Sequence, residues 1–164
     1  MRFVNKQLGR QIYVSIVVAG LFLPSVIGII VVLVIEPAEL AKLFVASARS
    51  LILIGLFNAI PFVVFSKLLR GWWSRTERSE AEPSVVLKHK YGLVFAAIAG
   101  LSSILYVHIN TWISIVKVLP GSSTAPISFI LAPIYGIIAI GLGYGLGMFI
   151  AKIQEIIMKS KGQI

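Results

Sequence analysis

Long stretches without a formal charge dominate the pattern along this chain of 164 residues. Residues 12–35 contain no charged side chain, and residues 91–116 contain only His108 as a side chain that can become cationic. A third stretch follows the turn-rich segment 119–126 and covers residues 127–151. Because a helix needs about 20 mostly apolar residues to cross a hydrocarbon core about 30 Å thick, each stretch is predicted to be a membrane-spanning helix.

The remaining apolar stretch is interrupted. Residues 50–66 lie between Arg49 and Lys67 and are somewhat short for a span. Starting at residue 43 gives a predicted span of full length, 43–67, with Arg49 near its outer end. Backbone amides in lipid must be paired within their own segment, so all four spans are predicted to be helical. The predicted fold is all-α: an integral membrane four-helix transmembrane bundle forming one domain over residues 1–164.

The basic residues predict how this bundle is oriented. Lys and Arg are enriched in the cytoplasmic flanks of membrane proteins. One predicted side carries twelve of the 15 Lys and Arg residues: Arg2, Lys6, Arg10, Lys67, Arg70, Arg75, Arg78, Lys88, Lys90, Lys152, Lys159 and Lys161. We therefore expect a multi-pass protein of the plasma (inner) membrane with both termini (N-in/C-in) and the loop 68–90 in the cytoplasm.

Composition narrows the function classes. The chain is 58% hydrophobic and 13% charged, and it contains no Cys. These values exclude a soluble globular enzyme, a disordered tail, a disulfide scaffold and a Cys-based zinc or redox site. The net charge of +9 is explained by the cytoplasmic flanks and their attraction to anionic headgroups. We expect the lipid bilayer as a partner and no nucleic acid.

Glycines in the fourth span form the most distinctive segment, residues 141–147. The spacing Gly-x-x-x-Gly lets helix backbones approach closely. The central Gly-Tyr-Gly also occurs in potassium filters, but a filter requires an extended loop behind a pore helix, and here the apolar run is continuous. The pattern favours helix packing, for which the candidate residues are Gly136, Gly141, Gly143, Gly145 and Gly147.

Few side chains are candidates for chemistry. Arg49, His108 and Asn110 lie near the predicted outer ends of the second and third spans and form a candidate polar pocket. The alternatives are that Arg49 snorkels to the interface and that the other two make ordinary interhelical hydrogen bonds. The two His residues lie on opposite predicted sides, and no Glu lies in a span core. We expect no metal, no cofactor, no catalytic residue and no enzymatic activity.

Three prolines inside predicted spans are candidate kinks. Proline cannot donate to the carbonyl four residues earlier, so Pro61 frees the carbonyl of Phe57 beside Asn58. Pro24 and Pro133 have the same effect in the first and fourth spans. Kinks of this kind suit a moving transporter as well as a static bundle.

Tryptophan prefers the headgroup level of a bilayer. Trp72 and Trp73 follow the second span and are predicted to anchor the cytoplasmic interface, and Trp112 is predicted to anchor the outer one.

The function expected from these features is non-catalytic. A glycine face built for close helix association predicts a subunit or accessory factor of a membrane complex, with a membrane protein or further copies of the chain as partner. One alternative is a small homo-oligomeric channel or transporter. Another is an immunity or toxin-shielding protein that meets foreign helices within the membrane.

Overall fold

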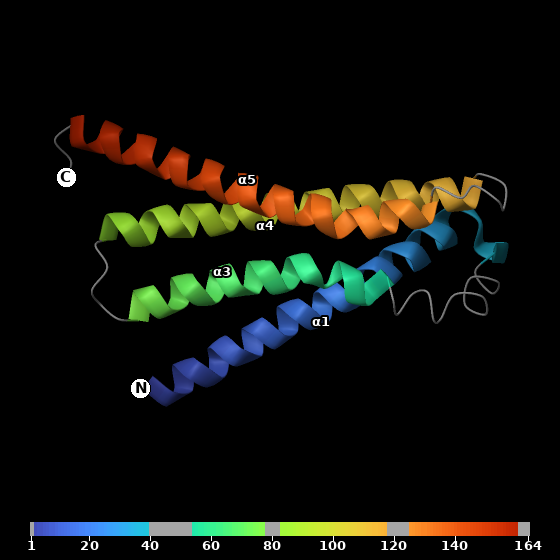
Figure 1. Ribbon diagram of the computed structural model, residues 1–164, viewed down its shortest axis with the longest axis horizontal. Coiled ribbons are helices and arrows are strands. Elements are labelled where there is room, and N and C mark those ends of the chain that lie inside the picture. The colour runs from blue at the N-terminus through green and yellow to red at the C-terminus, as the bar shows by residue number, and fades with distance from the viewer. Residues whose placement is uncertain (1, 40–53, 78–82, 118–124, 161–164) are drawn as a thin grey trace.

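The computed structural model describes residues 2–39, 54–77, 83–117 and 125–160. The described part contains helices and no strand (Figure 1). The elements are α1 (Arg2–Ile35), the short 3-10 helix η1 (Pro37–Glu39), α3 (Ile60–Glu77), α4 (Pro83–Lys117) and α5 (Ala125–Ser160). The chain turns out of α1 at Glu36, whose amide still donates to the carbonyl of Val32 at 2.9 Å.

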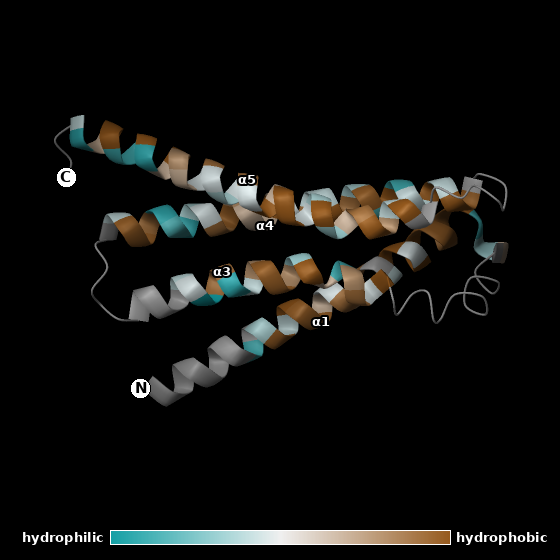
Figure 2. Cartoon of the chain, in the orientation of Figure 1, coloured by the Kyte–Doolittle hydropathy of each residue, from teal (hydrophilic) through white to brown (hydrophobic). Residues whose placement is uncertain are grey.

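Among the described residues, four helical segments are long and apolar enough to cross a membrane: Tyr13–Ile35, Ile54–Trp72, Ser84–Val116 and Ile127–Ser160. For this part of the chain, the prediction of an all-helical structure with four such segments is confirmed. Hydrophobic residues cover most of each segment, and hydrophilic positions gather toward the N-terminal end of α4 and the C-terminal end of α5 (Figure 2). The first part of the predicted span 43–67, with Arg49, lies outside the described residues.

A turn at Ala59 separates α3 from a helical stretch over residues 54–58. The cause is Pro61, which has no amide hydrogen to donate to Phe57. The hydrogen-bond ladder continues on both sides, because Ala59 donates to Gly55 at 2.9 Å and Val63 donates to Ala59 at 3.0 Å. The chain therefore runs on as one membrane-length segment with a local break at its proline.

The antiparallel helices α4 and α5 make the most extensive contact of any helix pair, and α1 and α3 pack alongside them (Figure 1). Two glycines of α5 make the pairing so close. A side chain at Gly143 would place its Cβ 2.5 Å from the carbonyl oxygen of Phe95, and one at Gly147 would collide with the carbonyl oxygen of Tyr91. Only glycine allows this backbone approach. The N-terminal end of α1 and the C-terminal end of α5 lie at the same end of the bundle.

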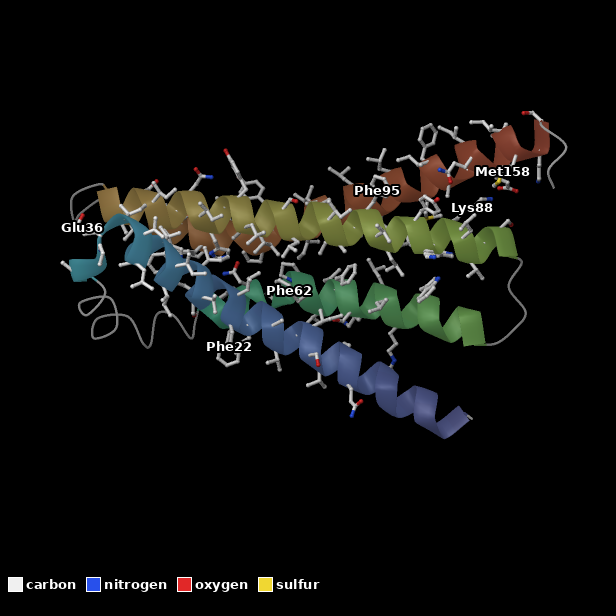
Figure 3. The ribbon with its side chains drawn as sticks, turned by 180° about the vertical axis from the view of Figure 1, so that it is seen from behind. Phe22, Glu36, Phe62, Lys88, Phe95 and Met158 are labelled. Carbon is white, nitrogen blue, oxygen red and sulfur yellow. The ribbon has the colours of Figure 1, made fainter. Side chains whose placement is uncertain are left out.

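Glycines also join α1 to the other helices. The ring of Phe62 from α3 packs on Gly20, and Phe62 lies where these two helices cross (Figure 3). The indole of Trp112 from α4 packs on Gly28. The main hydrophobic cluster forms at the latter contact and comprises Ile27, Val31, Trp112 and Phe129. The core of the bundle therefore includes side chains from α1, α4 and α5 near the end where α1 leads into η1.

Candidate functional site

A buried polar pair lies beside this core. His108 of α4 and Asn58, just before α3, are both fully buried, and 2.9 Å separates His108 Nε2 from Asn58 Oδ1. The amide nitrogen of Asn58 donates to the carbonyl of Ile54 at 2.7 Å. The Asn58 oxygen is therefore the acceptor, and His108 Nε2 must carry the donated hydrogen. The pair hydrogen-bonds two helical segments to each other with a defined histidine tautomer.

Aromatic rings surround His108 on α4. The ring of Phe129 from α5 lies with its centroid 5.4 Å from that of His108 and 5.3 Å from that of Trp112, the latter in an edge-to-face arrangement. Trp112 is 4% exposed. An interface anchor would expose its indole to the headgroups, whereas this indole fills the space beside the missing side chain of Gly28. The structure therefore places Trp112 in the core rather than at the surface position expected for an anchor.

Two polar atoms of this site lack a hydrogen-bond partner among the described residues: Nδ1 of His108 and Nε1 of Trp112. The other buried polar side chains in the neighbourhood bond to their own helices. Ser66 donates to the carbonyl of Phe62 at 2.6 Å, and Thr111 donates to the carbonyl of Val107 at 2.7 Å. Native proteins pair nearly all buried polar atoms, so the unpaired atoms of His108 and Trp112 single out this position.

Two members of the predicted polar pocket, His108 and Asn110, are not brought together. Asn110 is exposed and donates to the carbonyl of Tyr106 at 2.8 Å, on another face of α4 from His108. Residues two apart on a helix point in nearly opposite directions, which explains the separation. Arg49 lies outside the described residues. The partner of His108 is Asn58, which the sequence indicated only as the neighbour of the carbonyl freed by Pro61.

The glycine-rich segment divides into two ridges on different faces of α5. Gly143 and Gly147 are buried against α4, and on the same side a Cβ at Gly136 would lie 3.0 Å from Cγ of Pro61. Gly141 and Gly145 are exposed, and a Cβ on either would meet nothing within 4 Å. Only one of the two ridges is therefore used within the described part of the chain.

The prolines and the remaining tryptophans singled out by the sequence lie on three different helical segments. Pro61 lies at the break before α3, and Pro133 is buried inside α5. Pro24 lies within α1, and its side chain is outside the described residues, as is that of Trp73. Trp72 is half-buried on α3.

At the end of the bundle where α1 begins, α4 and α5 are joined by polar contacts. Nζ of Lys88 lies 2.6 Å from one carboxylate oxygen of Glu155, and Nζ of Lys159 lies 3.0 Å from the other. His89 Nδ1 and the hydroxyl of Tyr144 form a hydrogen bond nearby. No group of three or more potential metal ligands occurs in the described ranges.

Comparison with known proteins returned no match to any family model, any curated protein or any solved structure.

Proposed function

We propose that the chain is a multi-pass protein of the plasma (inner) membrane with both termini in the cytoplasm. Four helical segments of membrane length support insertion. The end of the bundle that holds the start of α1, the start of α4 and the end of α5 (Figure 1) also holds most of the basic residues of the described ranges. The positive-inside rule assigns that end to the cytoplasm.

We further propose that the protein is a non-catalytic subunit or accessory factor of a membrane complex, and that α5 makes the contact. The observation that carries this proposal is the open glycine ridge of Gly141 and Gly145. Glycine inside a helix is about 1 kcal/mol less favourable than alanine, so a glycine pair that faces only lipid has no compensating contact. A partner helix seated on the ridge would supply one.

The buried glycine pair on the other face of α5 supports this interpretation. Gly143 and Gly147, at the same spacing, bring the backbone of α4 against α5. Gly141 and Gly145 offer the same approach on a different face, flanked by the exposed side chains of Ile138, Leu142, Leu146 and Phe149. We infer that the partner presents a helix with a small-residue face of its own.

The buried polar side chains support a non-catalytic role. The hydroxyls of Ser66 and Thr111 donate to backbone carbonyls of their own helices, and His108 Nε2 is bound to Asn58. The two hydroxyls are thus bonded within their own helices and the histidine joins two segments, so none of these described groups forms a nucleophile–base pair.

The test compares Gly145→Leu with Ala97→Leu, a matched substitution at an exposed position of α4. Each variant is expressed in its native membrane, extracted gently, and analysed for particle mass and composition. We expect the wild-type chain and Ala97→Leu to be extracted with foreign membrane chains at a fixed ratio and Gly145→Leu to lose them. An unchanged particle for Gly145→Leu, or a wild-type particle without other chains, would contradict the proposal. A particle made only of copies of this chain would favour the homo-oligomeric channel or transporter instead.

A further inference from the structure

A row of polar side chains runs along α4 on the side away from the bundle. This polar row comprises Ser102, Tyr106, Asn110 and Ser114. A spacing of four residues puts its members on one face of the helix. All four are exposed, Tyr106 by 71%, whereas Ile104 and His108, each two residues from members of the row, are buried in the core. The row therefore faces outward from the described part of the chain.

The polar row lies within the apolar band of the bundle and not at its rim. The ring of Phe129 on α5 contacts rings two residues before and two residues after Asn110 on α4, so Phe129 and Asn110 lie at one level. Beyond this level α5 still exposes Ile127. α1 reaches the level near Gly28 and exposes apolar side chains for more than a turn beyond it, up to Val34. In the proposed orientation, Asn110 therefore lies below the outer headgroups.

The side chains of the row also lean away from those headgroups. The Cα–Cβ bonds of a helix tilt toward its N-terminus, and the N-terminus of α4 lies at the proposed cytoplasmic end. Asn110 accordingly bonds back to the carbonyl of Tyr106 at 2.8 Å. Tyr106 lies a turn deeper still, so it is not placed as an interface anchor.

Asn110 keeps hydrogen-bonding capacity that the described residues do not use. Its amide has two N–H groups and one oxygen. One N–H donates to Tyr106, while the other N–H and Oδ1 have no partner in the described ranges. An unpaired polar group is costly in lipid, where water is not an alternative. The amide therefore offers one donor and one acceptor to a neighbour in the membrane.

This combination fits a second copy of the chain. Two copies with the same topology, related by a twofold axis along the membrane normal, bring their α4 helices together in parallel, and each residue near the axis meets its own counterpart. Such a contact requires groups that pair with themselves. An amide and a hydroxyl each have a donor and an acceptor, whereas a charged side chain would meet a like charge. Every member of the polar row is an amide or a hydroxyl.

We propose that the polar row of α4 is the contact surface for a second copy of this chain, and that the free N–H of Asn110 in one copy donates to Asn110 Oδ1 in the other. The inference rests on the proposed membrane insertion and not on the proposed role of α5. A complex with foreign chains on α5 would then contain two copies of this one.

The experiment measures association of the purified full-length chain in liposomes of phosphatidylcholine and phosphatidylglycerol. Ala38→Cys in η1 carries the donor or the acceptor fluorophore, and energy transfer is followed against the protein-to-lipid ratio. Asn110→Leu is compared with Ile109→Leu, which introduces the same side chain at the adjacent exposed position. Flotation of the liposomes establishes insertion beforehand, so a lack of transfer then counts against the α4 contact alone.

We expect Ile109→Leu and Gly145→Leu to associate like the wild-type sequence. Asn110→Leu should need an about tenfold higher protein-to-lipid ratio for half-maximal transfer, as interhelical hydrogen bonds in model peptides imply. No transfer between wild-type copies, or no effect of Asn110→Leu, would overturn the proposal. Transfer lost in Gly145→Leu but not in Asn110→Leu would move the contact to α5 and overturn it as well.

Cross-linking in the native membrane locates the contact independently. Ser102→Cys lies in the polar row, and Leu101→Cys lies at the same depth on an exposed position outside the row. With an oxidant that enters the bilayer, we expect disulfide-linked pairs of copies for Ser102→Cys and not for Leu101→Cys. Equal linkage at both positions, or none at Ser102→Cys, would contradict the assigned face.

Discussion

The imidazole of His108 and the side-chain amide of Asn58 meet inside the bundle, with 2.9 Å between Nε2 and Oδ1, although 50 residues separate them in the chain. Both side chains are fully buried, so neither has water as an alternative partner. The contact joins α4 to the segment that leads into α3 and sets which histidine nitrogen carries the hydrogen. The contact therefore joins two segments of the bundle and also requires Nε2 of His108 to act as a donor.

Asn58→Leu removes the acceptor of this hydrogen bond and leaves the Nε2–H of His108 buried and unpaired. Leaving a buried donor unsatisfied destabilises a protein by about 1–3 kcal/mol. We expect a loss of that size in reversible unfolding in detergent or bicelles. His108→Phe combined with Asn58→Leu should cost less than the sum of the single variants, because the two residues share one interaction. Strict additivity would contradict the direct coupling.

Gly143→Ala and Gly141→Ala differ by two positions and should have opposite effects. A Cβ at Gly143 would lie 2.5 Å from the Phe95 carbonyl oxygen, a backbone atom that moves only if α4 and α5 separate. We expect a loss of about 1–3 kcal/mol, as for overpacked cores. Gly141 has open space around it, so alanine there should stabilise the isolated chain by up to about 1 kcal/mol. Thermal unfolding of both purified variants checks the signs, and a destabilising Gly141→Ala would contradict the assigned faces.

Gly28→Ala tests whether the indole of Trp112 packs on Gly28. An added Cβ would lie 2.6 Å from Cε2 of the indole, which is rigid and buried. We expect a lower unfolding temperature and a change in the emission of Trp112, because the ring must shift. Gly71→Ala is the control, since a Cβ added at that position would meet no heavy atom of another part of the structure within 4 Å. Equal effects of the two substitutions would show that the indole does not pack on Gly28.

Glu155→Gln removes both ion pairs at the end of α4 and α5. Pairs with partly exposed side chains contribute little to stability, and salt screens them. We expect a small loss of stability at low ionic strength that disappears at high ionic strength. Lys88→Gln should reproduce most of this loss and Lys159→Gln less, because the side chain of Lys88 is 25% exposed and that of Lys159 is 62% exposed. A salt-independent loss would instead indicate altered packing.

The orientation can be tested with single cysteines, because the chain has none of its own. Ala38→Cys lies in η1, and Ser160→Cys lies at the end of α5. With a thiol reagent that does not cross membranes, applied to intact cells, we expect labelling of Ala38→Cys and protection of Ser160→Cys. Labelling of Ser160→Cys after lysis provides the control. The reverse pattern would invert the proposed topology, and the same result at both positions would contradict their placement on opposite sides of the membrane.

The sequence alone predicted four helical segments of membrane length, as the described residues show. Charge-free runs of membrane length leave the backbone one way to pair its amides, which is a helix, and this constraint does not depend on neighbouring segments. The break at Pro61 is also local, because the missing amide hydrogen acts on a carbonyl in the same segment. These features could therefore be derived from the order of residues.

The faces of the helices could not be derived in this way. When every side of a helix is apolar, periodicity carries no information about which side meets a neighbour. The sequence could not show that Gly143 packs while Gly145 is open, that Asn110 faces away from His108, or that Trp112 lies in the core. These outcomes depend on steric fit between segments distant in the chain, such as the Gly143–Phe95 and Gly28–Trp112 contacts. Local chemistry determined that the chain forms helices, and only tertiary packing decided which residues those helices bring together.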